Sequence, residues 1–207
     1  MTELRVGGLA RLSSCDWPGE LVATVFCQGC PWDCPYCHNP HLLPARGERE
    51  LAWPDVLAFL DRRRGLLDGV VFSGGEPTAQ SALPAAVRTV HGMGFRIGLH
   101  TGGAYPNRLA AVLPWLSWVG FDVKAPFDEY ERITGVPGSG EKARTSLALL
   151  LESGVAYETR TTAPSNLIDD LAVSRLRSDL AILGVRDHRI QVYRPIGTRN
   201  GNLAAEQ

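Results

Sequence analysis

The sequence predicts an α/β fold in which short strands alternate with helices along a mostly parallel sheet. β-rich apolar runs and helical apolar patterns follow one another over nearly the whole chain, which is typical of repeated strand–helix units. Each expected strand also leads into a loop of unusual composition. Because the βα loops of a parallel sheet emerge at the carboxyl ends of its strands, a (βα)6-like fold would gather these loops at one edge.

Six strands are expected, over residues 21–27, 69–73, 95–100, 116–123, 156–162 and 189–194. The first leads into a cysteine-rich loop and the second into a Gly-Gly-Glu-Pro loop. The third leads into Thr-Gly-Gly, the fourth into Lys-Ala-Pro, the fifth into Ala-Pro and the sixth into Pro-Ile-Gly. We therefore expect the cysteine loop and the Gly-Gly-Glu-Pro loop to belong to one site, although about forty residues separate them.

Helices are expected between these strands. A proline suits the first turn of a helix over residues 54–64, and the apolar stripe of residues 83–90 has the i, i+3, i+4, i+7 spacing of a helix. Two further helices, over residues 141–153 and 169–183, end at Gly154 and Gly184. Glycine adopts the left-handed conformation that terminates helices, so these positions mark helix ends.

The composition indicates one globular domain over residues 1–207, with a core of about 19–197 between short extensions. Hydrophobic residues make up 44% of the 207 residues, charged residues 21%, and the formal net charge is −1. This balance favours neither a disordered chain nor a nucleic-acid partner. No apolar run is long enough to span a membrane, and the amino terminus does not resemble a signal peptide. We expect a cytoplasmic protein without a membrane partner.

Four of the five cysteines lie within residues 27–37. Thiolates are soft metal ligands, and no second, separated Cys-x2-Cys pair is present to complete a typical zinc knuckle. The spacing Cys30-x3-Cys34-x2-Cys37 can hold three corners of a [4Fe–4S] cube and leave the fourth iron open for chemistry. Cys27 leaves an alternative open, a four-cysteine site with a purely structural role. Cys27 can also be read as a small hydrophobic residue, and Cys15 as a free thiol.

The cysteine spacing, together with the later sequence Ser-Gly-Gly-Glu-Pro at residues 73–77, resembles the radical S-adenosylmethionine (SAM) superfamily. Within it, the chain resembles the glycyl-radical-enzyme activating proteins, most of all those of anaerobic ribonucleoside-triphosphate reductase. Supporting segments are residues 16–19, 67–72, 121–126 and 157–162, and the resemblance covers roughly residues 12–197. It implies a partial (βα)6 TIM-like barrel made of a single radical SAM domain.

The resemblance also implies two cofactors, a [4Fe–4S] cluster and SAM. Cys30, Cys34 and Cys37 would be the metal ligands and the catalytic residues, with SAM chelating the open iron through its amino and carboxylate groups. One electron would then cleave SAM to methionine and a 5′-deoxyadenosyl radical. The apolar and aromatic residues between the cysteines would shield the cluster.

The expected SAM site draws on several loops. Gly74 and Gly75 would let the backbone approach the ligand closely, Glu76 would accept a hydrogen bond from the SAM ammonium group, and Pro77 would stiffen the turn. Guanidinium groups favour carboxylates, so an arginine would bind the SAM carboxylate. The resemblance places further residues around SAM: Tyr36 and His38 on the adenine side, Thr101, Asp122 and Lys124 in strand-end loops, and Arg160 or Arg194 at the carboxylate.

Some of these residues also have a simpler interpretation in which they play no part in binding or catalysis. Asp122 and Lys124 could form a surface ion pair, and His100 could be a solvated loop histidine. Two positions depart from the family pattern: Cys27 stands where relatives commonly carry an apolar or small residue, and His100 stands where some relatives have an acidic one. The latter puts a cation site there in doubt.

Three functions remain open at this point. The first is an activase that installs a glycyl radical on a partner enzyme, with anaerobic ribonucleotide reductase as the expected partner and a flavodoxin or ferredoxin as the electron donor. The second is a radical SAM enzyme with a small-molecule substrate. The third is a non-catalytic module built on a zinc or cluster site.

Overall fold

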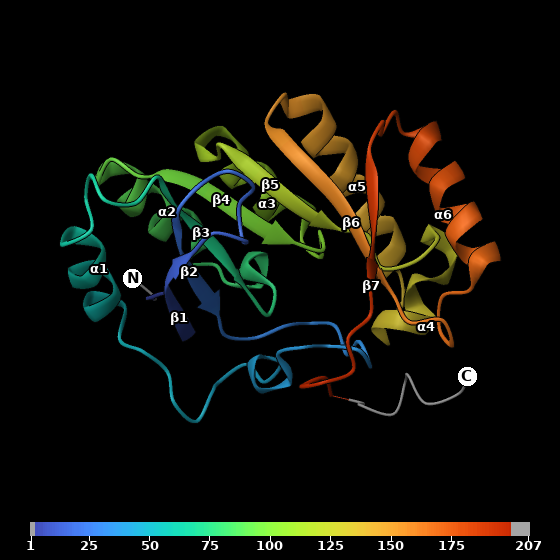
Figure 1. The fold of residues 1–207 in the computed structure, drawn as a ribbon, viewed down its shortest axis with the longest axis horizontal. Coiled ribbons are helices and arrows are strands. Elements are labelled where there is room, and N and C mark those ends of the chain that lie inside the picture. The colour runs from blue at the N-terminus through green and yellow to red at the C-terminus, as the bar shows by residue number, and fades with distance from the viewer. Residues whose placement is uncertain (1–2, 200–207) are drawn as a thin grey trace.

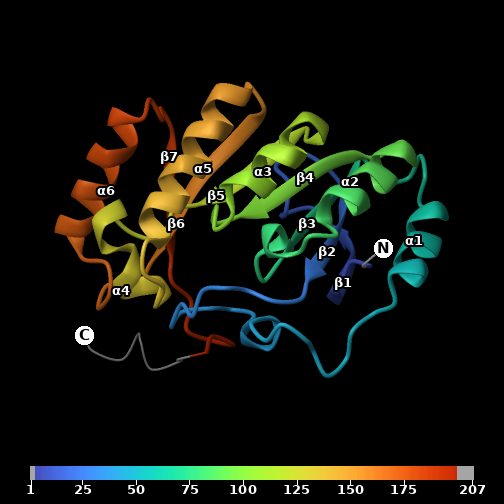
Figure 2. The same ribbon diagram turned by 180° about the vertical axis from the view of Figure 1, so that it is seen from behind.

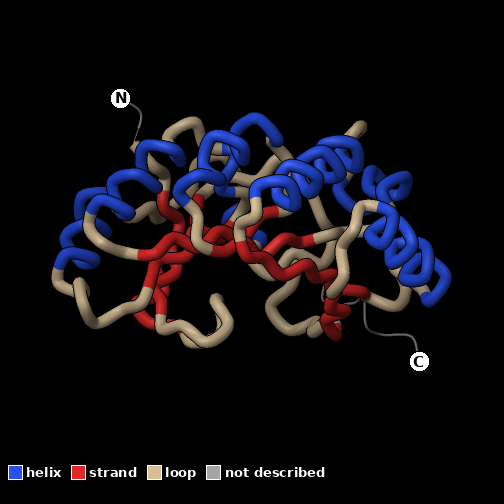
Figure 3. The backbone as a smooth tube through the Cα atoms, turned by 90° about the horizontal axis from the view of Figure 1, so that it is seen from above, coloured by secondary structure: helices blue, strands red, loops and turns tan. Residues whose placement is uncertain are grey.

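The computed structural model describes residues 3–199, whose strands form one curved sheet with helices along its convex face (Figures 1 and 3). Seven strands in these residues lie in the order β1-β2-β3-β4-β5-β6-β7. They are β1 (Val6–Ser13), β2 (Val22–Cys27), β3 (Gly69–Gly74), β4 (Arg96–Thr101), β5 (Trp118–Asp122), β6 (Ala156–Ala163) and β7 (His188–Val192). The ends of the expected domain, residues 1–2 and 200–207, lie outside the described residues.

All neighbouring strands from β2 to β7 pair in parallel, which confirms the expected α/β fold and the six strands read from the sequence. The sheet is open, since β1 and β7 occupy opposite ends of its order. The arrangement is therefore a partial barrel, and the helices of residues 3–199 lie along its convex side (Figure 3).

The antiparallel edge strand β1 was not predicted. It pairs with β2, and its register shifts between Val6 and Gly8 and again between Ala10 and Ser13. Adjacent glycines and irregular register weaken the period-two pattern by which a strand is recognised in sequence. Part of the expected amino-terminal extension thus forms an edge strand of the sheet.

The four expected helices are present, and two shorter ones were missed. The expected helices are α1 (Trp53–Asp61), α2 (Leu83–Gly92), α5 (Ser139–Ser153) and α6 (Asp170–Ile182). The missed helices are α3 (Pro106–Val112) and α4 (Tyr130–Thr134). Both are too short for a helical apolar stripe to repeat, so the sequence signal is weak. Gly154 and Gly184 have φ values of 72° and 87°, as expected for glycines that terminate helices.

The main hydrophobic core lies between the sheet and the helices, whose arrangement Figures 1 and 2 show from opposite sides. Alternate residues of the central strands, such as Val25, Phe72 and Phe121, point into it and are completely buried. Burying one such side chain contributes about 1.5–3 kcal/mol. The core therefore holds the parallel strands in register, and with them the loops at their carboxyl ends.

A second, smaller core cluster fills part of the concave face near the amino ends of the strands. It contains Trp17, Val22, Val71 and Trp118, and the two indole rings stack with centroids 5.7 Å apart. A Cβ atom on Gly98 would lie 2.9 Å from the Trp17 ring, so glycine makes room for the tryptophan there. The loop after β1 thus plugs one end of the concave face and leaves the carboxyl end for a site.

The helices formed by residues 3–199 are each too short or too polar to cross a lipid bilayer.

Candidate active site

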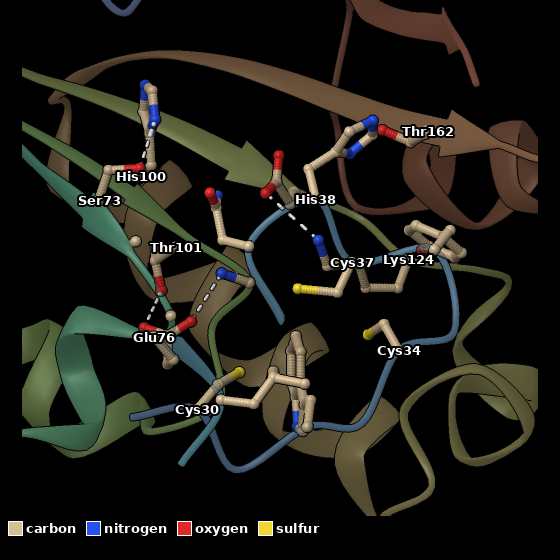
Figure 4. Close-up of a pocket in the computed structure, with 18 of the residues that line it drawn as sticks. Cys30, Cys34, Cys37, His38, Ser73, Glu76, His100, Thr101, Lys124 and Thr162 are labelled. Carbon is tan, nitrogen blue, oxygen red and sulfur yellow. Dashed lines mark hydrogen bonds and ion pairs between the residues drawn. The ribbon is translucent and has the colours of Figure 1, made fainter. Parts of the chain in front are cut away.

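A cavity of about 250 Å³ lies at the carboxyl ends of the parallel strands (Figure 4). Twelve of the fourteen residues expected to form the site line it: Cys30, Cys34, Tyr36, Cys37, His38, Gly74, Gly75, Glu76, Thr101, Asp122, Lys124 and Arg160. The loops after β2, β3, β4 and β5 contribute together with the ends of β6 and β7, so residues as far apart in sequence as Cys30 and Gln191 meet here. Pro77 and Arg194 do not line the cavity.

The cysteine loop follows β2 and is held by backbone hydrogen bonds from several directions. The amide of Cys30 donates to the carbonyl of Leu43 (3.1 Å), and the amide of Asp33 donates to that of Thr134 (2.8 Å). Figure 4 shows the thiols of Cys30, Cys34 and Cys37 arranged around one space. Burial raises the pKa of Cys30 to about 12 and also raises that of Cys34, so both thiols hold their protons in the absence of a bound cation.

No group of three His, Cys, Asp or Glu side chains within residues 3–199 is placed to hold a single metal ion. Four thiolates on one tetrahedral zinc, each about 2.3 Å from the metal, would have to lie within about 4 Å of one another. In an iron–sulfur cube, by contrast, each cysteine binds a different iron. The wide arrangement of the three thiols around the cavity therefore suits a cluster better than a single ion.

Cys27 is separate from the other cysteines of the loop. It is the last residue of β2, is completely buried in the main core and does not line the cavity. Burial raises the pKa of its thiol well above the usual range. Its environment is that of a small hydrophobic residue, which is the reading that the sequence favoured over a fourth ligand.

The Gly-Gly-Glu-Pro loop is hydrogen-bonded directly to the cysteine loop, as its expected place in one site requires. The amide of Gly75 donates to the carbonyl of Cys27, and that of Glu76 donates to the carbonyl of Gly29, each at 2.9 Å. Gly74 has a φ of 111°, and a Cβ atom on Gly75 would lie 2.4 Å from the Gly29 oxygen. The two glycines are thus required by the close approach of the two loops, whereas the sequence suggested close approach to a ligand.

Glu76 is buried and accepts four hydrogen bonds. Its Oε1 accepts from the Thr78 amide (3.0 Å), the Thr78 hydroxyl (2.5 Å) and the Thr101 hydroxyl (2.7 Å), and its Oε2 accepts from the Gly102 amide (2.9 Å). Burial raises the pKa of this carboxyl group, and the four donors oppose that shift. Oε2 has one donor and keeps capacity for another. Thr101 was expected near SAM, and the hydrogen bond that its hydroxyl donates helps to orient the Glu76 carboxylate.

Asp122 lies between two cations at the ends of β5 and β6. Its Oδ1 is 2.6 Å from Nε of Arg160, and its Oδ2 is 3.3 Å from Nζ of Lys124. Burial alone would raise the pKa of Asp122, but Arg160 and Lys124 hold it well below its usual range. Burial likewise works against the charge of Lys124, yet Asp122 raises its pKa. The three groups are therefore all charged near neutral pH and give this wall of the cavity one net positive charge.

His100 is buried, so the reading of a solvated loop histidine is wrong. Its Nε2 lies 2.7 Å from the Asp16 carbonyl oxygen, to which it donates, and its Nδ1 then accepts from the Ser73 hydroxyl at 3.1 Å. Burial and the positive charge of Arg160 lower its pKa to about 4. His100 is consequently neutral near pH 7, and the loop that plugs the concave face fixes its tautomer.

Tyr36 and His38 lie on the same wall but in different environments. The Tyr36 side chain is buried, and its hydroxyl has no hydrogen-bond partner among the described residues. His38 is exposed, with Nε2 3.0 Å from the carbonyl oxygen of Arg194. The Arg194 side chain is exposed and does not line the cavity, so Arg160 is the arginine that the structure brings to the site. Residue 194 lies two positions beyond β7, where the backbone rather than the side chain faces His38.

Pro77 is buried at the first position of a short 3-10 helix over Pro77–Ala79, where its fixed φ suits the turn. It therefore shapes the loop, as expected, without lining the cavity. Ser73, Thr162 and Gln191 line the cavity although the sequence analysis gave them no role. Ser73 and Thr162 are the last residues predicted for their strands, so the rule that parallel strands gather function at their carboxyl ends could have identified them.

Comparisons with known proteins agree with this geometry. The family model described as the radical SAM superfamily matches residues 24–167. A protein of Methanocaldococcus jannaschii, whose name provisionally describes it as a glycyl-radical enzyme activating enzyme, is 28% identical over 80% of this chain and 70% of its own. The pyruvate formate-lyase-activating enzyme of Clostridium pasteurianum is 31% identical over 63% of this chain and 57% of its own.

Among solved structures, SuiB of Streptococcus suis bound to S-adenosylmethionine has the same fold over 81% of this chain, with a TM-score of 0.61 and 12% identity. The chain spans 39% of the length of SuiB. The family model covers more than half of the chain, including the cysteine loop, the Gly-Gly-Glu-Pro loop and the ends of β3, β4, β5 and β6 at the cavity. This match sets aside the alternative of a non-catalytic zinc module. The chain belongs to the radical SAM superfamily, whose enzymes use a [4Fe–4S] cluster and S-adenosylmethionine.

Proposed function

We propose that the protein is an activating enzyme that removes a hydrogen atom from the Cα of a glycine in a partner enzyme and leaves a glycyl radical there. The observation that carries the proposal is the similarity to the Methanocaldococcus jannaschii protein over most of both chains. The similarity to a pyruvate formate-lyase-activating enzyme points in the same direction. The expected partner is the anaerobic ribonucleotide reductase of the same organism.

Cys30, Cys34 and Cys37 are the proposed ligands of the cluster. Their thiols line one cavity, and they are spread more widely than a single metal ion requires. Three cysteine ligands leave one iron of a cube without a protein ligand, and the cavity beside it is large enough for a small molecule to reach that iron. Because burial raises the thiol pKa of Cys30 and Cys34, these residues give up protons when the cluster binds.

The remaining cavity wall fits a zwitterion, which supports SAM as its occupant. When bound together, the cluster and SAM supply a 5′-deoxyadenosyl radical by one-electron cleavage of SAM. Glu76 offers the free capacity of Oε2 to the ammonium group, and Lys124 or Arg160 offers a cation to the carboxylate. Of the two arginines proposed from the sequence, Arg160 is retained because its side chain lines the cavity.

Other residues position these groups and exclude water. The Trp32 ring packs so closely on Gly102 that a Cβ atom there would lie 2.2 Å from it, which seals the cavity beside the Gly102 amide that holds Glu76. Neutral His100 accepts a hydrogen bond from the Ser73 hydroxyl and thereby fixes the orientation of this hydroxyl at the cavity wall. A dry, fixed wall of this kind protects a reactive intermediate from side reactions.

The sheet with its one continuous strand order supports a single radical SAM domain over residues 1–207. A low-potential carrier, a flavodoxin or ferredoxin, is the proposed electron source. The chain spans 57% of the length of the Clostridium pasteurianum activating enzyme.

The decisive chemistry is the transfer of hydrogen from glycine. The ribonucleotide reductase subunit is prepared with glycine deuterated at Cα and mixed anaerobically with reduced protein and SAM. The proposal predicts that the Cα–D bond of one glycine breaks and that deuterium appears at C5′ of 5′-deoxyadenosine, as measured by mass spectrometry. Unlabelled 5′-deoxyadenosine, formed at a rate that the subunit does not change, would contradict it.

A further inference from the structure

A short segment follows the edge strand β7 in sequence and is hydrogen-bonded to the cysteine loop. This segment, residues 193–199, is called the strap below. Its Arg194 carbonyl accepts a hydrogen bond from His38 (3.0 Å), and its Arg199 amide donates to the Cys37 carbonyl (2.9 Å). The Arg199 side chain forms an ion pair with Asp33. Figures 1 and 2 show the strap passing from β7 to the loop after β2, so it links two segments that line the cavity, at Gln191 and at Cys37 and His38.

Two large apolar side chains, one at the end of β7 and one in the strap, are turned to solvent. Val192, the last residue of β7, is 86% exposed, and Ile196 in the strap is 92% exposed. These are the highest exposed fractions of any large apolar residue among the described residues. A single exposed apolar residue is ordinary, but two that lie four positions apart, just beyond the cavity-lining Gln191, offer apolar surface for a partner to cover.

The backbone at the same place is also open to a partner. β7 ends the strand order, and within residues 3–199 its outer edge has no backbone hydrogen bond to another segment. Natural proteins usually protect such an edge with charge, and here Arg189 at the start of β7 pairs with Glu158. The carboxyl end carries Gln191 and Val192 instead of a charge. The protection therefore stops where β7 reaches the cavity, which Gln191 lines.

We propose that β7 and the strap form the docking surface for the glycine-bearing segment of the partner protein. The segment binds in extended form along the free edge of β7, and its apolar side chains pack on Val192 and Ile196. Strand addition of this kind supplies affinity through backbone hydrogen bonds and specificity through alternate side chains. The inference rests on the proposed function, because it names how the substrate of that same site is held.

The position of the edge explains why the occupant is an extended peptide. A glycine can lose its Cα hydrogen in the cavity only if its backbone lies at the cavity mouth. The carboxyl end of β7 lies at the cavity, because Gln191 lines it together with Thr162, and their side-chain oxygens are 3.4 Å apart. A peptide strand added to β7 would therefore lead to the cavity mouth. Glycine carries no side chain, so its backbone can enter where other residues would not fit.

The test compares two double variants, each of which removes two strongly exposed apolar side chains. The first is Val192→Ser with Ile196→Ser. The matched control is Leu171→Ser with Ile182→Ser on α6, whose side chains are 70% and 78% exposed and do not line the cavity. Affinity for the anaerobic ribonucleotide reductase subunit is measured by anaerobic calorimetry, together with the affinity for SAM and the thermal unfolding midpoint.

The docking variant is expected to bind the subunit at least tenfold more weakly, a loss of about 1.4 kcal/mol, while the control binds like the wild type. SAM affinity and unfolding midpoint are expected to be unchanged in both. Amide hydrogen exchange of residues 188–196 is expected to slow when the subunit binds. Equal affinity of the two double variants, or unchanged exchange, would overturn the inference alone. No complex between the wild type and the subunit would overturn the proposed partner, and the inference with it.

Discussion

Replacement of Glu76 by glutamine tests whether this carboxylate holds the site together. Glutamine has the same shape, and its oxygen can still accept from Thr78 and Thr101, but its amide nitrogen would then face the Gly102 amide across a distance of 2.9 Å. The variant loses a hydrogen bond to a charged acceptor, worth about 1.5–3 kcal/mol, and leaves buried donors unpaired at a further cost of about 1–3 kcal/mol. Easier burial of a neutral amide offsets part of this sum.

The expected net result is a loss of about 2 kcal/mol in the free energy of unfolding, which shifts the urea midpoint down by roughly 1 M. Urea denaturation of the cluster-free protein at pH 7 measures it. The control is Glu131→Gln, because Glu131 is exposed on α4 and its carboxylate has no hydrogen bond within the described residues. A Glu76→Gln midpoint equal to that of the control would refute the structural role assigned to the carboxylate.

Three further predictions address the thiols, the buried histidine and the packing of the loops. The Cys27→Ser variant should keep its iron after anaerobic reconstitution. The variants Cys30→Ser, Cys34→Ser and Cys37→Ser should each lose most of it, as measured by iron content and by the visible absorption of the cluster. For His100, a folded-state pKa of about 4 means that the neutral form stabilises the fold, so this stability is complete above pH 6.5 and falls as the pH drops toward 4. In the wild type, this loss of unfolding free energy should reach about 3 kcal/mol. The His100→Gln variant lacks the titrating group and should not show it, so identical pH profiles of unfolding free energy in the wild type and this variant would contradict the assignment. Gly75→Ala should lower the free energy of unfolding by about 1–3 kcal/mol, since its Cβ would lie 2.4 Å from the Gly29 oxygen, and a variant as stable as wild type would show that the two loops separate easily.

The central parallel strands could be predicted because their signal is local and strong. Apolar runs such as residues 69–73 and 95–100 end at glycine-containing loops, and the carboxyl-end rule then places those loops together. Strand β1 escaped because glycines and register shifts obscure its alternation, and α3 escaped because it is short. Sequence patterns thus locate repeated elements better than they locate irregular additions.

The cavity residues were predictable where a strand end determines their position. Asp122 and Arg160 pair across the neighbouring strands β5 and β6 at the same level of the sheet, so both reach the cavity. Arg194 lies outside the cavity because it follows the end of β7, where the chain has left the sheet. The reason for the two glycines also required the structure, since a contact with the Gly29 carbonyl cannot be read from a turn motif.

The burial of His100 likewise depends on tertiary structure. Its partner Asp16 lies 84 residues earlier, in a loop that reaches the concave face only because β1 pairs with β2. A sequence reading that misses β1 has no means of placing that loop. The family resemblance named the cofactors, but the positioning of the neutral histidine is a property of this fold.

Electron paramagnetic resonance tests the central claim most directly. The reduced, cluster-loaded protein is mixed anaerobically with SAM and the anaerobic ribonucleotide reductase subunit of the same organism. The account predicts a doublet from a glycyl radical on the subunit, and a change of that doublet when the glycine is deuterated at Cα. A reduced cluster whose signal shifts on addition of SAM, without any glycyl signal on the subunit, would contradict activation of this partner and direct the search to another glycyl radical enzyme or to a small-molecule substrate.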